Sequence, residues 1–175
     1  MISLKEYLIE GILDIEDNLD KDYIKTRIEA FIKENYRIIG QLKMNSVNGI
    51  YIVDCTGFVE VRNKNIESLT NGLFEWGEVN GFFKCSYCDK LQSLEGAPIK
   101  VDKSFYCVGC NSLQSLEGAP EKVNRDFYCN VCISLKSLKG APKEVKRDFY
   151  CFSCKKQFTK EDVEKVCKVK KCIYV

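Results

Sequence analysis

Four Cys-x-x-Cys pairs are the residues of this 175-residue chain whose type and spacing could do chemistry. They recur every 22 residues, as Cys85/Cys88, Cys107/Cys110, Cys129/Cys132 and Cys151/Cys154. The 18 residues between Cys88 and Cys107 match the spacing of a zinc site built from four thiolates. Two such sites would use all eight of these cysteines, and zinc would then be the cofactor.

A core ladder of free thiols is the alternative explanation for the pairs, and it is the one we favour. Cysteine packs as a small hydrophobic residue, and the other repeated positions are also packing residues. Large side chains occupy the loops in which zinc knuckles favour small ones: Tyr87, Val108, Val131 and Phe152. We therefore expect no bound metal. Disulfides are also not favoured, because the N-terminus lacks the apolar stretch of a signal peptide, which predicts a reducing cytoplasm.

Catalysis has little support in this sequence. The chain has no histidine, which excludes Ser-His and Cys-His catalytic pairs. It contains no Gly-x-x-x-x-Gly-Lys, Gly-x-Gly-x-x-Gly or Gly-x-Ser-x-Gly motif. We therefore expect a protein that is not an enzyme and has no catalytic residues.

Charge and hydropathy argue against two kinds of partner. The chain carries 27 basic and 25 acidic side chains, so its net charge gives no general case for nucleic acid or an anionic membrane. A lysine-rich segment at 155–175 is the one basic cluster, and nucleic acid is not favoured on that signal alone. No window approaches the roughly 20 apolar residues of a membrane span, so no membrane association is expected.

The elements that position the cysteines belong to a 22-residue repeat. Its unit reads Phe-x-Cys-x-x-Cys-x-x-Leu-x-Ser-Leu-x-Gly-Ala-Pro-x-x-Val. A fixed period of this length predicts a solenoid, whose turns bury a continuous core only by stacking. The Phe, Cys, Leu and Val positions would point inward and Gly-Ala-Pro would form a corner. We expect equivalent strands to lie about 4.8 Å apart in one parallel sheet.

The strand positions between the inward residues form columns on the outer surface. One column holds Lys84, Tyr106, Tyr128 and Tyr150, and the next holds Ser86, Val108, Asn130 and Phe152. Tyrosine is favoured at interfaces, so the tyrosines, with Val108, Phe152 and Lys84, are the predicted partner-binding residues. Stacked tyrosines could instead serve only to stabilise neighbouring strands. A homo-oligomer formed through this face is a further alternative.

Three regions follow from these patterns, and together they predict an α/β repeat solenoid. Residues 1–57 form an N-terminal α/β cap, with a capping box at Ser3-x-x-Glu6, a second helix over about 20–35, and strands at 37–43 and 50–55 around the Asn48-Gly49 turn. Residues 58–158 hold a degenerate first repeat and then the regular ones. Residues 159–175 form a C-terminal cap, with a short helix from Thr159 to about Cys167 and a strand at 171–175.

The Phe-x-Cys-x-x-Cys-x-x-Leu segment resembles the strand and asparagine-ladder segment of leucine-rich repeats in their cysteine-containing variant. In that family the last cysteine takes the place of the ladder asparagine. The phrase Leu-x-Ser-Leu-Glu-Gly-Ala-Pro is similar to repeats in small leucine-rich-repeat-like proteins of tailed, crAss-like phages. This sequence departs from the ordinary pattern by using Phe and Cys where Leu is usual.

The resemblance implies a phage product that binds another macromolecule and has no shared chemistry. The expected function is therefore that of a non-enzymatic protein-binding module in the bacterial cytoplasm, which engages a host protein such as a defence or regulatory factor. Two alternatives stay open. One is a zinc-stabilised four-cysteine module that binds nucleic acid, and the other is a structural component of the virion.

Overall fold

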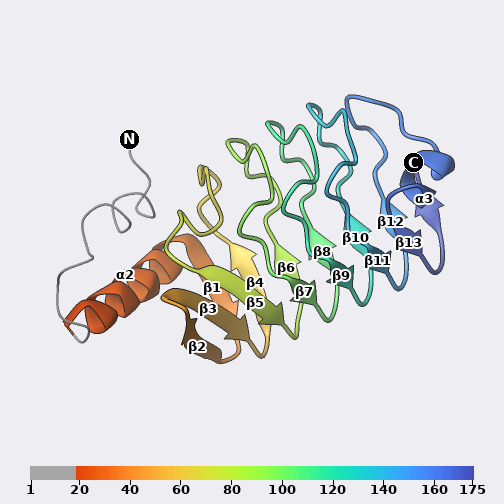
Figure 1. Cartoon of the computed structure of the whole chain (residues 1–175). Coiled ribbons are helices and arrows are strands. Elements are labelled where there is room, and N and C mark those ends of the chain that lie inside the picture. Colours follow the sequence, from red (N-terminus) through yellow and green to blue (C-terminus); the bar gives the residue numbers. More distant parts are fainter. Residues whose placement is uncertain (1–18) are drawn as a thin grey trace.

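The computed structural model describes residues 19–175, which form a β-solenoid with two sheets on opposite sides of one core (Figure 1). This confirms the predicted repeat solenoid. The helix predicted around Ser3-x-x-Glu6 lies outside the described residues. Two helices are present in the described part, α2 (Leu19–Asn35) at the N-terminal end and α3 (Lys160–Glu164) at the C-terminal end.

Sheet A contains the Phe-Tyr strands of the repeat. Its strands, in spatial order, are β1 (Tyr36–Ile39), β4 (Phe58–Val61), β6 (Phe83–Lys84), β8 (Phe105–Tyr106), β10 (Phe127–Tyr128), β12 (Phe149–Tyr150) and β14 (Ile173–Tyr174). All neighbours are parallel except β1 and β4. The register aligns equivalent residues, as in the pairing of Phe105 with Phe127 and of Tyr106 with Tyr128.

Sheet B contains the strands that end on the repeated valine. Its strands, in spatial order, are β13 (Lys168–Val169), β11 (Glu144–Val145), β9 (Lys122–Val123), β7 (Lys100–Val101), β5 (Glu75–Val79), β3 (Ile50–Cys55) and β2 (Leu42–Val47). Here β2 and β3 are antiparallel and the other neighbours are parallel. Val79 pairs with Val101 and Val101 with Val123, so the valines form a column.

The existence of sheet B differs from the prediction of one parallel sheet. After the Gly-Ala-Pro corner the chain becomes extended again, and its backbone N–H and C=O groups need partners. The equivalent segments of the neighbouring repeats supply them, and the Asn124 N–H, for example, donates to the Val101 carbonyl of the preceding repeat at 2.9 Å. Each repeat therefore adds one strand to each sheet.

The core contains the residues that were predicted to point inward. Phe83, Phe105, Phe127 and Phe149 have no exposed surface, and their rings stack with centroids 5.1–5.6 Å apart. The repeated leucines and valines are also buried, as are seven of the eight paired cysteines, with Cys154 partly exposed. Each turn therefore buries the same small set of apolar groups, and a continuous core results from stacking them.

Glycine is required at the corner of the repeat because successive turns approach closely there. Gly118 has φ +83°, and a Cβ at this position would lie 2.3 Å from the Glu95 backbone nitrogen of the preceding turn. Gly140 has φ +81°, and its Cβ would lie 2.4 Å from the Glu117 Cα. Any side chain would both strain the backbone and push the turns apart.

The N-terminal end is closed by α2 and by the antiparallel strands. Helix α2 covers the predicted range of about 20–35, and its Ile28 and Ile32 are buried. Strands β2 and β3 form the predicted hairpin, in which Asn48 (φ +51°) and Gly49 (φ +78°) both adopt the left-handed conformation that a tight hairpin turn needs.

The strand predicted over 37–43 is divided into two. Gly40 has φ +134°, and a Cβ there would lie 2.5 Å from the Gly57 nitrogen. The chain turns at this close contact, so β1 joins sheet A while β2 joins sheet B. The predicted strand was wrong because its hydrophobic pattern carries no signal for a change of sheet.

The C-terminal end is closed by α3 and two short strands. Thr159 caps the helix in a capping box with Asp162, as predicted. The helix ends at Glu164, short of the predicted Cys167, and the chain then adds β13 to sheet B and β14 to sheet A. The C-terminal cap therefore extends each sheet by one strand.

Candidate functional site

The alternation of each sheet A strand places its phenylalanine inward and its tyrosine outward. In β8, Phe105 has no exposed surface whereas Tyr106 is partly exposed, and β10 and β12 repeat this arrangement. Because the strands pair in register, the buried phenylalanine stack fixes the position of every tyrosine above it. The structure thus brings together the three tyrosines that the sequence predicted as one column.

These tyrosines form a stacked ladder, which Tyr174 of β14 extends. The rings of Tyr106, Tyr128, Tyr150 and Tyr174 lie with successive centroids 4.7, 4.4 and 4.6 Å apart and interplanar angles of 5–7°. We call these four residues the Tyr ladder. Tyr174 was missed because its strand reads Ile-Tyr instead of Phe-Tyr, although the Tyr itself was a usable signal.

Two phenylalanines continue the ladder toward the N-terminal end of sheet A. The Phe82 ring lies 6.1 Å from Tyr106, and the Phe58 ring stacks on Phe82 at 4.5 Å. The Arg37 guanidinium lies over Phe58, 5.9 Å from its centroid. The Tyr ladder with Phe58 and Phe82 is called the aromatic array here, and it runs from β4 to β14. Phe58 and Phe82 each follow a glycine and lie outside the predicted Tyr column.

The side chains of the aromatic array are each partly exposed. Within the Tyr ladder, each inner ring is covered on both faces by its neighbours at 4.4–4.7 Å. Burial raises the pKa of the Tyr128 hydroxyl above its ordinary value, and the neighbouring Asp126 carboxylate raises it further. Tyr128 is therefore a neutral hydrogen-bonding group set in an apolar surface.

The other residues predicted for this face have different environments. Phe152 is 41 % exposed and Val108 is partly buried, so both can widen the apolar surface beside the Tyr ladder. Lys84 occupies the ladder column and forms an ion pair with Glu60 at 3.1 Å. Ser86, predicted in the outer column, is only 2 % exposed, which removes it from the surface.

A strained loop adds apolar groups that were not predicted for this face. The residue before the second cysteine of each pair has positive φ, and three of these four positions carry side chains: Tyr87 (+60°), Val131 (+62°) and Ser153 (+55°). Tyr87 is 60 % exposed and Val131 is 40 % exposed. A β-branched residue such as Val131 rarely adopts this conformation, so the fold tolerates strain in order to keep the loop shape.

The cysteine ladder is bound into the backbone of the solenoid. The second cysteine of a pair donates its S–H to the first cysteine's carbonyl of the preceding repeat. The pairs are Cys110 to Cys85 at 3.1 Å, Cys132 to Cys107 at 3.1 Å and Cys154 to Cys129 at 3.3 Å. The first cysteines donate in the other direction, and Cys107 Sγ lies 3.3 Å from the Tyr128 carbonyl. These contacts give the thiols a structural role.

Burial disfavours the thiolate form of these cysteines. It raises the pKa of the Cys88 and Cys132 thiols to about 12 and that of Cys154 to about 11. In the described residues, no three Cys, Asp or Glu side chains are grouped so that they could hold one metal ion. The zinc alternative stays a prediction that elemental analysis of the purified protein tests, and about two zinc ions per chain would support it.

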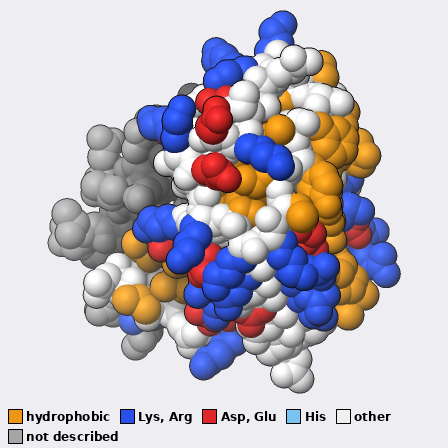
Figure 2. All heavy atoms as spheres, turned by 90° about the vertical axis from the view of Figure 1, so that its right-hand side faces the viewer, with side chains coloured by type: hydrophobic (Ala, Val, Ile, Leu, Met, Phe, Trp, Pro, Cys, Tyr) orange, Lys and Arg blue, Asp and Glu red, His pale blue; other side chains and the backbone are white. Residues whose placement is uncertain are grey.

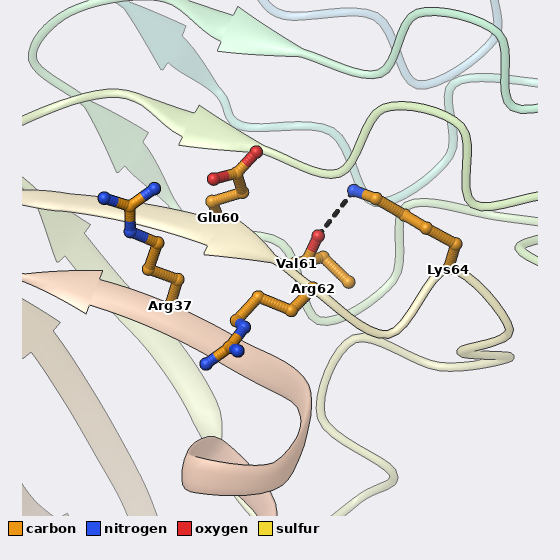
Figure 3. A pocket seen from close by; sticks show the side chains of 5 residues that line it. All are labelled: Arg37, Glu60, Val61, Arg62 and Lys64. Atoms are coloured by element: carbon orange, nitrogen blue, oxygen red, sulfur yellow. Dashed lines mark hydrogen bonds between the residues drawn. The ribbon is translucent and has the colours of Figure 1, made fainter.

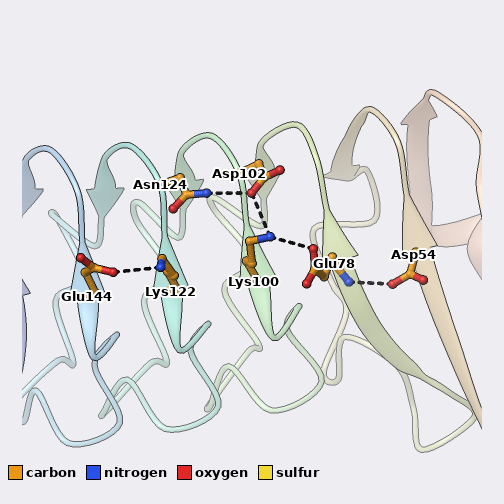
Figure 4. Close-up of polar contacts among 7 residues, drawn as sticks. All are labelled: Asp54, Glu78, Lys100, Asp102, Lys122, Asn124 and Glu144. Atoms are coloured by element: carbon orange, nitrogen blue, oxygen red, sulfur yellow. Dashed lines mark hydrogen bonds and ion pairs between the residues drawn. The ribbon is translucent and has the colours of Figure 1, made fainter.

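The outer face of sheet B has a different composition, dominated by ion pairs between neighbouring turns (Figure 4). Lys100 lies 2.8 Å from Glu78, and Lys122 lies 3.1 Å from Glu144. Hydrogen bonds from Lys170 and Lys122 lower the pKa of Glu144 to about 2. The charges on this face are largely satisfied by one another.

The apolar side chains of the surface are unevenly distributed. Viewed toward the C-terminal end of the solenoid, they gather in a band along one side, bordered by Lys and Arg side chains (Figure 2). Tyr174, Phe152 and Val131, each at least 40 % exposed, come from sheet A or from the loops that follow its strands. Part of the exposed hydrophobic surface thus lies beside the Tyr ladder, and another part lies on the β2–β3 hairpin, where Val47 and Ile50 are exposed.

The comparisons with known proteins add no relative. The chain matches no family model, no curated protein and no solved structure, so the resemblance to leucine-rich-repeat-like phage proteins stays a prediction. Among residues 19–175, none of the helices combines the length and the apolar character that crossing a membrane requires.

Proposed function

We propose that this protein is a non-enzymatic binding module that engages a partner protein through the outer face of sheet A. The observation that carries the proposal is the aromatic array, a continuous and partly exposed surface from Phe58 to Tyr174. Contiguous exposed apolar surface usually marks an interaction site, and tyrosine offers large contact area at a low entropic cost.

The chemistry of the array also favours a protein partner. Its tyrosine hydroxyl groups can donate and accept hydrogen bonds beside an apolar strip, a combination that is common in protein interfaces. The ladder is held rigid by the buried phenylalanine stack, so binding would require little reorganisation. Following the resemblance, the setting we propose is a phage product that binds a host protein in the bacterial cytoplasm.

The test compares two surfaces of the same turns. Replacing Tyr106, Tyr128 and Tyr150 with Ser removes the array from β8, β10 and β12, and the matched control replaces Lys100, Lys122 and Glu144 with Ser on β7, β9 and β11. Partners are captured from bacterial lysate, identified by mass spectrometry, purified, and titrated by calorimetry. Circular dichroism and thermal unfolding show that both variants are folded.

We expect the partner to bind the native protein and the sheet B variant with similar affinity. The tyrosine variant should lose binding by at least about tenfold, as removal of central aromatic contacts usually does. Equal affinity for all three proteins would contradict the proposal. A doubled mass in light scattering that disappears with the tyrosine variant would instead identify the partner as a second copy of the chain.

A further inference from the structure

A hollow lies at the N-terminal end of sheet A, beside the aromatic array. Arg37 of β1, Glu60 and Val61 of β4, and Arg62 and Lys64 of the following loop line it, and its volume is about 490 Å³ (Figure 3). Three of the five lining residues are cationic. We call it the cationic hollow.

The charges of the cationic hollow are incompletely compensated. Its one carboxylate, Glu60, already pairs with Lys84 at 3.1 Å. The Lys64 ammonium donates to the Val61 carbonyl, as the dashed line in Figure 3 shows. In the described part of the chain, neither Arg37 nor Arg62 forms an ion pair, and both are exposed. Two guanidinium groups thus remain available for an external anion.

A guanidinium group is shaped to bind a carboxylate through two parallel hydrogen bonds. Arg37 and Arg62 lie at one end of the aromatic array. They would therefore favour a ligand that has carboxylates at one end and apolar groups along the rest of its length. The cationic hollow and the array are in direct contact, since Arg37 lies over Phe58 and Phe58 stacks on Phe82. One ligand can therefore cover both.

The same surface is unsuited to nucleic acid. Bases bind such proteins by stacking on free aromatic faces, and the inner rings of the Tyr ladder have both faces covered. The row beside the ladder carries Asp126 and Asp148, whose backbone and side-chain contacts hold them at this surface. Asp126 pairs with Arg147 at 3.7 Å, so of the two it is Asp148 that would repel a phosphate backbone following the solenoid axis.

We infer that the cationic hollow binds the acidic end of a partner segment whose apolar part lies along the aromatic array; the inference rests on the proposed function. Seven strands at about 4.8 Å spacing span roughly 29 Å, which an extended segment of about nine residues covers. The partner segment would thus carry Asp or Glu residues over β1 and β4, and aliphatic or aromatic residues over β8 to β14.

The test selects ligands from a library of random 12-residue peptides displayed on phage, with the native protein as bait. We expect enrichment of peptides with clustered Asp or Glu at one end and apolar residues in the rest. A synthetic copy of the most enriched peptide is then titrated by fluorescence anisotropy. Arg37→Gln with Arg62→Gln should weaken its binding by at least about tenfold and reduce the salt dependence.

Matched variants make the result specific. Lys155→Gln with Lys160→Gln removes two exposed charges outside the face and should leave affinity unchanged. Tyr128→Ser should weaken binding with an unchanged salt dependence. Enriched peptides without an acidic cluster, or equal binding by the arginine variant, would overturn the inference and leave the proposed function standing.

Two further outcomes are decisive. If the native protein enriches no peptide beyond those enriched by the triple tyrosine variant, both the inference and the proposed function fail. If a fluorescein-labelled single-stranded 20-nucleotide DNA binds more tightly than the peptide and loses affinity in the arginine variant, the cationic hollow is a phosphate site and the inference is wrong.

Discussion

The two sheets of this solenoid are built by the same repeats, yet their outer faces satisfy their side chains in opposite ways. On sheet B, lysines and glutamates of neighbouring turns pair with one another, as Lys122 does with Glu144 (Figure 4). On sheet A, tyrosines of neighbouring turns stack and stay partly exposed. Ion pairs therefore dominate one face, whereas stacked aromatic rings dominate the other.

Repetition in register has different consequences for aromatic and for charged side chains. A repeat in exact register places like residues side by side, which suits aromatic rings because they attract one another. The same register places like charges side by side where the residue type is kept, as it does for Lys100 and Lys122 on sheet B. The type changes from Glu78 to Lys100 and from Lys122 to Glu144, and these changes give each lysine an acidic neighbour.

The largest expected effect comes from alkaline pH, which acts on the thiols of the core. Burial raises the pKa of Cys88 and Cys132 from an ordinary 9.0 to about 12. Between these values the unfolded chain loses protons that the folded chain keeps, so stability is complete below pH 9 and falls as pH rises. Each such thiol should lower the free energy of unfolding by about 1.4 kcal/mol per pH unit.

Denaturant unfolding at pH 8, 9 and 10 with reductant present measures this slope. Cys132→Ala removes one buried thiol and should make the slope shallower, even though the variant is less stable at every pH. An identical slope in the variant would show that the buried thiols do not cause the alkaline loss of stability.

The second prediction compares the loss of stability caused by a core substitution in each of the two sheets of one turn. Phe127→Ala in β10 should lower the free energy of unfolding by about 3–5 kcal/mol, because the ring is fully buried in the phenylalanine stack. Val123→Ala in β9 removes two buried methyl groups and should cost about 2 kcal/mol. Equal losses in chemical denaturation would mean that the two sheets contribute equally to the core.

A smaller effect, of opposite sign, is expected at the strained loop. Val131 has φ +62°, and Val131→Gly should raise the free energy of unfolding by about 1 kcal/mol through relief of the left-handed conformation. The converse change, Gly109→Val, should destabilise the protein, because its Cβ would lie 2.6 Å from the Tyr87 ring. Thermal unfolding of the two variants tests these predictions. A lower unfolding midpoint for Val131→Gly than for the native protein would show that the conformation of Val131 is not strained.

The smallest effect is expected on the outer face of sheet B. Lys122→Ala breaks one partly exposed ion pair, and surface pairs contribute little. The loss should disappear in about 1 M salt, which screens such charges. Tyr128→Ser on the neighbouring strand of sheet A is the control, because lost ring stacking should be insensitive to salt. If the stability lost in Lys122→Ala did not depend on salt, the outer face of sheet B would not be stabilised by charge, and the contrast with sheet A would be wrong.

Much of the fold was predictable because the repeat supplies the same evidence several times. Phe105 and Val101 were assigned to the core, and the Asn48-Gly49 hairpin was confirmed. The division of the strand at Gly40 could not be predicted, since it depends on the approach of Gly57 from a distant turn. Sheet B was missed for a similar reason, because two-residue strands have no periodicity of their own.

The candidate site shows the same division. The column of Tyr106, Tyr128 and Tyr150 followed from alternation along the repeat. Phe58 and Phe82 belong to the array only through ring contacts between turns. The cationic hollow joins Arg37 to Arg62, which lie on strands and loops that meet only after folding. No local sequence pattern therefore predicts that these charged residues form one site.

By itself, the sequence determined that this protein stacks 22-residue turns around Phe, Cys, Leu and Val, because these apolar side chains recur at fixed positions of the repeat and a Gly-Ala-Pro corner recurs with them. Tertiary structure alone decided that each turn contributes to two sheets, that the thiols donate to the preceding turn, and that the aromatic array meets an unpaired cationic end. The physical reason is that burial patterns act along the chain, whereas register and close approach depend on which turns become neighbours.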